Sequence, residues 1–518
     1  MKDFENKNRR LSPVNIGLRV LNIIIKCIFA VVILAFQIAV IYLTVFYPLR
    51  QPWLNTVSGI LAAVSACYVY WNDQNTSYKI LWIIVIIILP IAGTTLYLLY
   101  GGGKSAPQRR QRKADSLYLP MVPKNDSVLR IKDNSARKTA RTIKFLSGFP
   151  CYKGAEVTYF GDGTPLHLDM LGNLAKAEKY VFLESFIIAD GRLWNEISSV
   201  LEERAEKGVK IYILFDSFGS FGRLSSKSVK KLYRHKNVKI VGFNPVGIKL
   251  TPALNHRDHR KMVVIDGKIA YTGGINFADE YVHYIEKYGF WRDTGVKITG
   301  QALSSYVILF CQNWFMATKR LLDPHAFLVE NPPSEKENFV MPFGDSPADD
   351  RNPAYNCCMS MIENAADTLY ISTPYLIIDE EMIAALCRAA ASGVDVRILT
   401  PGIPDKKLVY TVTRSHYGKL LKNKVKIYEF TPGFNHSKMI LADGKNALAG
   451  SINLDYRSLL LHYETGTFIS GDECTAEMKK DFLEAVKLSH EVTEEEYEAR
   501  PFYVKATQFV LHLIAPLL

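Results

Sequence analysis

Cysteine is scarce in this 518-residue sequence, and its eight copies are scattered. Only Cys357 and Cys358 are close together, and no Cys-x-x-Cys pair or Cys/His cluster with zinc-ligand spacing occurs. These absences exclude a disulfide framework and a structural zinc site. A glycine-rich phosphate loop is also missing, because Gly161–Pro165 (GDGTP) is typical of a turn.

Charge is sparse as well. Charged residues make up 22% of the chain and apolar residues 48%, a balance that allows large cores or membrane spans. The formal net charge is +12, so there is no acidic excess. A basic chain suits a polyanionic partner, which is either nucleic acid or an anionic membrane surface.

The N-terminal hundred residues hold long apolar runs. Segments at about 22–48 and 80–100 each contain an uncharged stretch that exceeds the ~20 residues needed to span a bilayer. The segment 53–71 is a weaker third candidate, because polar residues interrupt it between two tryptophans. A cleaved signal peptide fits poorly, and buried core helices are the alternative. We expect residues 1–114 to form a membrane anchor that ends in a basic juxtamembrane segment.

Basic residues flank this anchor on both sides, in the first ten residues and in Lys104–Lys113. By the positive-inside rule both flanks are cytoplasmic, which requires an even number of crossings. Three candidate segments leave two alternatives: one is re-entrant or interfacial, or one flank breaks the rule. We expect a multi-pass protein of the cell membrane whose soluble part faces the cytoplasm.

From about Asp115 the chain repeats itself. Ala177–Ser185 (AEKYVFLES) parallels Ala366–Thr373 (ADTLYIST), and Gly208–Ser220 parallels Gly393–Asp405. Apolar strands alternate with helical patterns, which predicts two related α/β/α sandwich domains with mostly parallel sheets. We place a first repeat at 115–330, a second repeat at 331–500 and an amphipathic tail at 501–518. That tail docks on the core or lies at an interface.

Each repeat contains one histidine–lysine unit. "NHRDHRKMVVIDGKIAYTGGIN" (255–276) and "NHSKMILADGKNALAGSIN" (435–453) both predict a strand, an Asp-Gly turn and a second strand. Side chains alternate faces along a strand, so His259 and Lys261 share a face, as do His436 and Lys438. The turn aspartates, seven residues after each histidine, fall on the opposite face or beyond the strand. They are expected to hold the turn.

Two such units near one axis predict a site for a tetrahedral anion. Lys261 and Lys438 would bind the non-bridging oxygens of a phosphodiester, and Asn276 and Asn453 would donate hydrogen bonds. One imidazole would attack phosphorus while the other protonates the leaving alcohol. The lysines supply the positive charge, so neither a metal nor another cofactor is expected.

Both units resemble the HxKxxxxDxxxxxxGxxN pattern of the phospholipase D superfamily. The first copy has Gly274 where the second has Ser451. The matching positions are His259, Lys261, Asp266, Gly273 and Asn276, then His436, Lys438, Asp443, Gly450 and Asn453.

The N-terminal apolar and basic segments, "FWRDTGVKITG" and the tail "FVLHLIAPLL" are similar to bacterial cardiolipin synthases. This resemblance implies phosphatidyl transfer between two phosphatidylglycerols through a phosphohistidine, giving cardiolipin and glycerol. It implies anionic phospholipids and the membrane as partners, and the N-terminal histidine as nucleophile. The residues it marks as catalytic are His259, Lys261, Asp266, His436, Lys438 and Asp443, and those it marks as substrate-binding are Asn276, Asn453 and Ser451.

Because the turn aspartates face away, other carboxylates must orient the imidazoles. Asp293 in "FWRDTG" and Glu464 in "HYETG" follow the two histidines at comparable distances, and the superfamily places an acidic residue there. We expect Asp293 beside His259 and Glu464 beside His436.

Other functions carry the same motif pair. Nucleases and tyrosyl-DNA phosphodiesterases would suit the positive charge, but the apolar segments argue against nucleic acid as a partner. A membrane-anchored phospholipase D that uses water, a phosphatidylserine synthase and a non-catalytic membrane scaffold are the remaining alternatives. Acyl preference, the alcohol acceptor and the oligomeric state are not fixed by the sequence.

Overall fold

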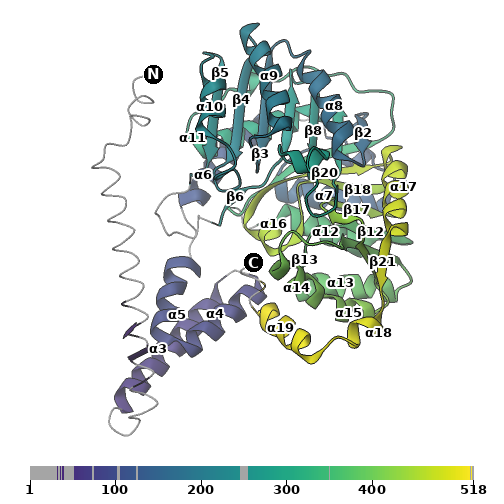
Figure 1. Ribbon diagram of the computed structural model, residues 1–518. Helices are drawn as coiled ribbons and strands as arrows, with labels where there is room; N and C mark the ends of the chain where they lie inside the picture. The colour runs from purple at the N-terminus through teal and green to yellow at the C-terminus, as the bar shows by residue number, and fades with distance from the viewer. Residues whose placement is uncertain are drawn as a thin grey trace. The chain divides into compact units, whose positions relative to one another are not determined.

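The computed structural model describes residues 52–72, 75–101, 106–123, 126–245, 255–348 and 351–513, with single residues 32, 35, 36, 38, 39, 42 and 515. The described chain forms two compact units. One contains the residues up to Gly101, and the other those from Ala106 onward (Figure 1).

The first unit is helical, with α3 (Pro52–Trp71), α4 (Thr76–Ile88), α5 (Pro90–Leu96) and η1 (Tyr97–Gly101). Trp82 packs edge-on against Tyr97 at 5.4 Å between ring centroids. The predicted segment 80–100 is not one helix, because Pro90 disfavours helical geometry at Leu89 and divides it there.

Among the residues that the structure describes, no helix combines the length and apolar character needed to cross a bilayer. The predicted segment 22–48 lies outside the described residues, apart from six single positions. The predicted segment 53–71 corresponds to α3.

The first repeat supplies a seven-stranded sheet, shown in blue to teal in Figure 1. The interior strand β3 is buried along its whole length, which fits helices covering a sheet on both faces. The strand order is β2 (Glu156–Phe160), β10 (Gly295–Thr299), β8 (Ile269–Gly273), β7 (Met262–Ile265), β3 (Tyr180–Ser185), β4 (Lys210–Asp216) and β5 (Val238–Phe243). The helices of this repeat are α8 (Gly163–Leu174), α9 (Arg192–Glu206), α10 (Ser226–Tyr233), α11 (Leu303–Thr318) and the short η5 (Asp279–Val282).

A ten-stranded sheet belongs mainly to the second repeat, in green to yellow. Its main path is β1 (Tyr152–Lys153), β11 (Phe339–Asp345), β20 (His462–Ser470), β18 (Asn446–Gly450), β17 (Met439–Ala442), β12 (Thr368–Ser372), β14 (Asp395–Pro401), β15 (Lys426–Phe430) and β21 (Ser489–Val492), while β6 (Arg257–Asp258) pairs with β20. The helices are α12 (Pro353–Asn364), α13 (Glu380–Ala391), α14 (Lys407–Ser415), α15 (Tyr417–Lys422), α16 (Tyr456–Leu460), α17 (Cys474–Lys487) and α18 (Glu494–Glu498). In the unit from Ala106 onward, the α-helices α6 (Ala106–Tyr118) and α7 (Asn134–Ser147) precede the sheets.

Both sheets are mixed, so the expectation of mostly parallel sheets is wrong. Within the two large sheets, the parallel neighbours that come from one repeat are the helix-linked strands: β3, β4 and β5 in the first, and β12, β14 and β15 in the second. The hairpins β7–β8 and β17–β18 and the returning strands β10 and β20 pair antiparallel. A two-residue hairpin can join only antiparallel strands, so the Asp-Gly turns impose this pattern.

The predicted hairpin turns are confirmed. Asp266 and Gly267 have φ of 53° and 67°, and Asp443 and Gly444 have φ of 55° and 63°. Two successive positive φ values are typical of a type I′ turn, which Asp-Gly favours.

The two repeats share one hydrophobic core and exchange strands. Phe182 and Phe310 of the first repeat stack at 4.1 Å in the same cluster as Phe343 and Phe468 of the second. First-repeat strands β1 and β6 join the second sheet, and β9 (Phe290–Arg292) pairs in parallel with β16 (Gly433–Asn435). A further small pair joins β13 (Leu376–Ile377) to β19 (Leu454–Asp455).

The tail forms α19 (Phe502–Leu513). Leu511 and the isolated residue Ala515 pack into a cluster with Val412 of α14. Phe502 and Phe509 remain exposed. The helix therefore docks on the core along one side and presents apolar side chains on another.

Candidate active site

Each motif histidine follows a short strand that crosses to the other repeat. His259 comes directly after β6 and His436 directly after β16, and each motif lysine precedes the first strand of its hairpin. Lys261 Nζ donates to the His259 carbonyl at 2.6 Å, and Lys438 Nζ donates to the His436 carbonyl at 2.5 Å. Lys438 Nζ also lies 2.9 Å from His436 Nδ1, so the shared face predicted for this pair is confirmed.

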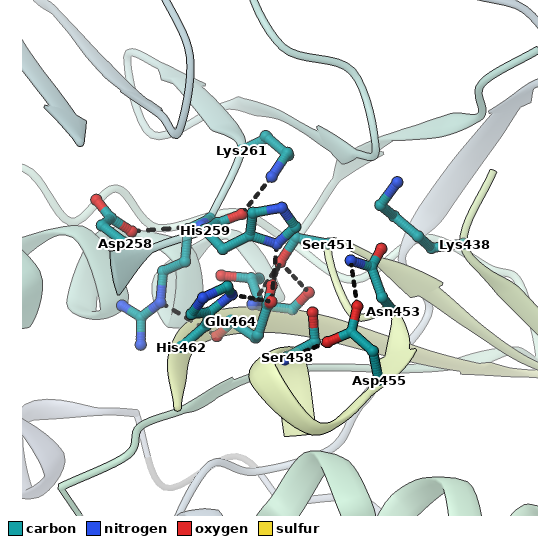
Figure 2. Close-up of polar contacts among 12 residues, drawn as sticks. Asp258, His259, Lys261, Lys438, Ser451, Asn453, Asp455, Ser458, His462 and Glu464 are labelled. Atoms are coloured by element: carbon teal, nitrogen blue, oxygen red, sulfur yellow. Dashed lines mark hydrogen bonds and ion pairs between the residues drawn. The ribbon is translucent and has the colours of Figure 1, made fainter. Parts of the chain in front are cut away.

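The register between β6 and β20 determines the partner of His259. Asp258 pairs with Tyr463, and the His259 amide donates to the Tyr463 carbonyl at 2.9 Å. The next residue of β20 is Glu464, and its Oε1 lies 2.8 Å from His259 Nδ1. The carboxylate that orients the first histidine therefore comes from the second repeat (Figure 2).

The second histidine is arranged in the same way. Asn435 of β16 pairs with Arg292 of β9, and the His436 amide donates to the Arg292 carbonyl at 2.7 Å. Asp293 Oδ2 then lies 2.5 Å from His436 Nδ1. The expected pairing of Asp293 with His259 and of Glu464 with His436 is wrong, because the crossing strands exchange the two carboxylates between the repeats.

The motif aspartates lie away from the imidazoles. Asp266 accepts hydrogen bonds from the backbone amides of residues 178, 179 and 180 at 2.8, 2.7 and 2.8 Å. Asp443 does the same for residues 366–368, at 2.8–3.1 Å. Each aspartate fixes its turn against the start of the neighbouring strand, as the parity argument predicts. The catalytic assignment carried over from the motif does not match this placement.

Ser451 was expected to bind substrate, but it contacts a carboxylate. Its Oγ donates to Glu464 Oε2 and accepts from the Thr465 amide at 3.0 Å. A side chain at Gly274, the equivalent position, would bring its Cβ within 2.0 Å of Asp293 Oδ1. The two repeats therefore support their carboxylates differently, one through a hydroxyl and the other through close packing on a glycine.

The two motif asparagines are buried and already bonded to protein groups. Asn276 Nδ2 donates to the Tyr281 hydroxyl at 2.7 Å, and its Oδ1 accepts from the Ile187 amide at 3.0 Å. Asn453 Nδ2 donates to Asp455 at 3.1 Å. An amide NH₂ carries two hydrogens, so each asparagine keeps one N–H for another acceptor.

Burial sets the protonation of the basic groups. It lowers the pKa of His259 to about 3, although Glu464 opposes the shift, and it lowers the pKa of His436 well below the usual range with help from Lys438. Burial also lowers the pKa of Lys261 to about 7 and that of Lys438 to about 8. Both imidazoles are therefore neutral at pH 7. An anionic ligand beside the two lysines would stabilise their protonated forms.

The two carboxylates behave differently. Burial raises the pKa of Asp293 to about 7, against the opposing charge of Lys438. Burial also disfavours ionisation of Glu464, but His259 and Lys261 outweigh it and hold the pKa of Glu464 well below its usual range. The Asp293–His436 pair therefore retains a proton near neutrality, while Glu464 stays ionised beside a neutral His259.

One residue near the site was missed by the sequence interpretation. His462 is buried, and its ring lies 5.3 Å from that of His259. Its Nδ1 is 3.8 Å from Glu464 Oε1. The signal was present, since residues 462 and 464 share one face of a strand.

The charges of both repeats act on a common site. Lys261 of the first repeat lowers the pKa of His436, and Lys438 of the second repeat lowers the pKa of Lys261. Two neutral imidazoles, each held by a carboxylate and each beside a lysine, are suited to displacement at a phosphodiester. This geometry defines a site of the phospholipase D type.

Comparisons with known proteins agree. The family model described as "Cardiolipin synthase, PLD-like domain" matches residues 170–294 and 358–486, and that described as "Phospholipase_D-nuclease N-terminal" matches 60–102. A cardiolipin synthase of Geobacillus kaustophilus is 31% identical over 90% of this chain and 95% of its own length. An uncharacterized protein of Streptococcus mutans is 38% identical over 88% of this chain and 99% of its own.

A solved phosphatidylserine synthase of Haemophilus influenzae shares the fold, with a TM-score of 0.58 and 17% identity over 74% of this chain and 100% of that one. The chain belongs to the cardiolipin synthase family of the phospholipase D superfamily and is an enzyme of this phosphatidyltransferase class.

Proposed function

We propose that this enzyme is a cardiolipin synthase that transfers a phosphatidyl group from one phosphatidylglycerol to another and releases glycerol. The observation that carries the proposal is the pair of crossed histidine–carboxylate contacts, His259 with Glu464 and His436 with Asp293. The names of its relatives supply the substrate class, since they include the cardiolipin synthases of Geobacillus kaustophilus and Bacillus anthracis.

In the first step, His259 attacks phosphorus. Glu464 accepts the Nδ1–H, which leaves a lone pair on Nε2 for the attack. A phosphorus–nitrogen bond forms, and the bond from phosphorus to the glycerol oxygen breaks. The leaving glycerol takes the proton held by His436 and Asp293, whose shared proton persists near neutral pH because burial raises the pKa of Asp293 to about 7.

In the second step, the glycerol hydroxyl of another phosphatidylglycerol attacks the phosphohistidine. His436 removes the hydroxyl proton, the phosphorus–nitrogen bond breaks, and His259 returns to its starting state. One phosphodiester replaces another, so no activated donor is consumed and the reaction is reversible.

The lysines provide charge stabilisation in both steps. Lys261 and Lys438 are nearly fully buried, and charge in a water-poor site interacts strongly with the phosphoryl oxygens. Their pKa values, lowered by burial to about 7 and 8, rise when an anion binds beside them. Substrate binding therefore favours protonation of both lysines, and their positive charge stabilises the transition state.

We infer that the enzyme works at the bacterial cell membrane with its catalytic repeats on the cytoplasmic side. Apolar side chains are exposed along the first unit, including Trp53, Val64 and Ile87. The sequence of α6 is rich in arginine and lysine, and basic residues near an anionic surface contribute about 1 kcal/mol each. A lipid surface supplies a lipid hydroxyl in place of water as acceptor.

The test is to incubate the purified full chain with phosphatidylglycerol vesicles and to separate the lipids by chromatography. Cardiolipin together with free glycerol is the expected outcome. Phosphatidic acid together with glycerol would instead identify a membrane-anchored phospholipase D that uses water. A His259→Ala protein provides the baseline.

A further inference from the structure

His462 takes no part in the mechanism above, yet its ring lies beside that of His259. Its side chain is over nine-tenths buried, and neither ring nitrogen has a hydrogen-bond partner among the described residues. A buried polar group without a partner costs roughly 1–3 kcal/mol. A ligand bound to one of these nitrogens would offset that cost.

The groups around His462 are metal ligands by type. One ligand atom each from His259, His462 and Glu464 lie within 4.8 Å of one another, and all three side chains are buried. Glu464 Oε1 lies 2.8 Å from His259 Nδ1 and 3.8 Å from His462 Nδ1. Dashed lines run from both rings to this carboxylate in Figure 2.

These separations suit a small tetrahedral cation. Ligand bonds of about 2.0–2.2 Å place neighbouring tetrahedral ligands roughly 3.3–3.6 Å apart. Two imidazoles and one carboxylate form a three-ligand set that zinc commonly accepts, with the fourth position left to water. Magnesium and calcium prefer six or more oxygen ligands and do not fit this set.

We propose that His259, His462 and Glu464 form an inhibitory site for Zn²⁺ or a similar borderline transition-metal cation. The binding itself is independent of the proposed function, whereas the inhibition rests on it. The ion replaces the hydrogen bond between His259 and Glu464, and it gives the His462 ring the partner that it lacks.

Inhibition follows from the chemistry of imidazole. A neutral ring that binds a cation through Nδ1 carries its single proton on Nε2. The proton that Nδ1 gives up is the one that Nε2 takes, so the protein releases no net proton on this ring. The lone pair that attacks phosphorus is thereby lost, and the nucleophile is silenced without a change in fold.

Binding is tested first, with the full chain in detergent micelles competing against a chromophoric zinc chelator. The wild-type protein is compared with His462→Asn and His259→Gln proteins. His490→Gln serves as a matched control, because His490 is an exposed histidine whose ring pairs with Glu496. We expect zinc affinity to fall by roughly tenfold or more in the first two variants and to stay unchanged in the control.

The second readout is phosphatidyl transfer with added Zn²⁺, with Mg²⁺ in parallel. Zinc should inhibit the wild-type protein, EDTA should restore it, and Mg²⁺ should have no such effect. The inhibition constant should rise by roughly tenfold or more in the His462→Asn protein, measured relative to that variant's own uninhibited rate.

Equal zinc affinity in the wild-type and His462→Asn proteins overturns the site. If zinc binding depends on His462 but zinc does not inhibit phosphatidyl transfer, the inhibitory role is overturned. Because chelator competition needs no turnover, the site is tested even if the protein makes no cardiolipin. If the His462→Asn protein does not fold, the His259→Gln protein decides the same question.

Discussion

Exchanging the two orienting carboxylates for amides separates their functions. In a Glu464→Gln protein the Nδ1–H of His259 loses its ionised acceptor. In an Asp293→Asn protein, His436, the proposed proton donor, loses the carboxylate that lies 2.5 Å away. If the pairing is crossed, the first change impairs the nucleophile and the second impairs the acid.

The size of the first effect follows from the contact that is lost. A hydrogen bond to a charged group contributes about 1.5–3 kcal/mol, and each 1.36 kcal/mol of barrier is about tenfold in rate. The loss of this hydrogen bond alone should therefore slow the attack by about 10- to 100-fold. If the new amide turns its NH₂ toward Nδ1, the wrong tautomer is favoured, and the loss approaches about 10⁴-fold, as for the equivalent change in a serine protease triad.

The assay uses phosphatidyl-p-nitrophenol, whose leaving group departs without a proton. The burst of p-nitrophenol should be slow in the Glu464→Gln protein and close to wild type in the Asp293→Asn protein. Glu429→Gln is the control, because Glu429 is a mostly buried glutamate that pairs with Arg414 at 3.1 Å. A fast burst in Glu464→Gln with a lost burst in Asp293→Asn refutes the reasoning. Mapping the phosphorylated histidine then distinguishes reversed pairing from reversed roles.

Four further predictions follow from the site. His259→Ala should abolish both adduct and turnover, whereas His436→Ala should still form an acid-labile adduct from the p-nitrophenol substrate; an adduct on His436 in the His259→Ala protein would reverse the roles. Asp266→Ala should leave three amides unbonded and lower the free energy of unfolding by about 3 kcal/mol, read from denaturation curves, while the folded protein keeps most of its activity. For the wild-type enzyme, kcat/KM should fall as pH rises through about 7 to 8, because Asp293 and the motif lysines, with pKa values of about 7, 7 and 8, lose their protons there; a flat profile to pH 10 contradicts this. Gly274→Ser should displace the Asp293 carboxylate and reduce turnover about tenfold or more, and unchanged activity would show that the 2.0 Å approach is relieved elsewhere.

Local features of the site could be predicted from the sequence. The Asp-Gly turns, the strands around them and the shared face of each histidine and lysine depend on residues that are near neighbours in the chain. The same parity argument correctly moved Asp266 and Asp443 off the reactive face. It also applies to His462 and Glu464, and His462 was missed because only motif positions were followed.

The long-range pairing could not be derived in this way. The two repeats are equivalent in pattern, so sequence spacing does not distinguish a carboxylate of the same repeat from one supplied by the other. That choice depends on which short strand lies beside which, β6 beside β20 and β16 beside β9. The mixed direction of the sheets could have been predicted, because the predicted hairpins already require antiparallel neighbours.

The strand exchange has a consequence for synthesis of the chain on the ribosome. His259 emerges about two hundred residues before Glu464, and until then its imidazole lacks the carboxylate that selects the reactive tautomer. A nascent or truncated chain thus carries a complete first motif whose histidine lacks its orienting carboxylate. If the enzyme has the proposed function, its full phosphatidyl-transfer activity arises only after translation has passed Glu464.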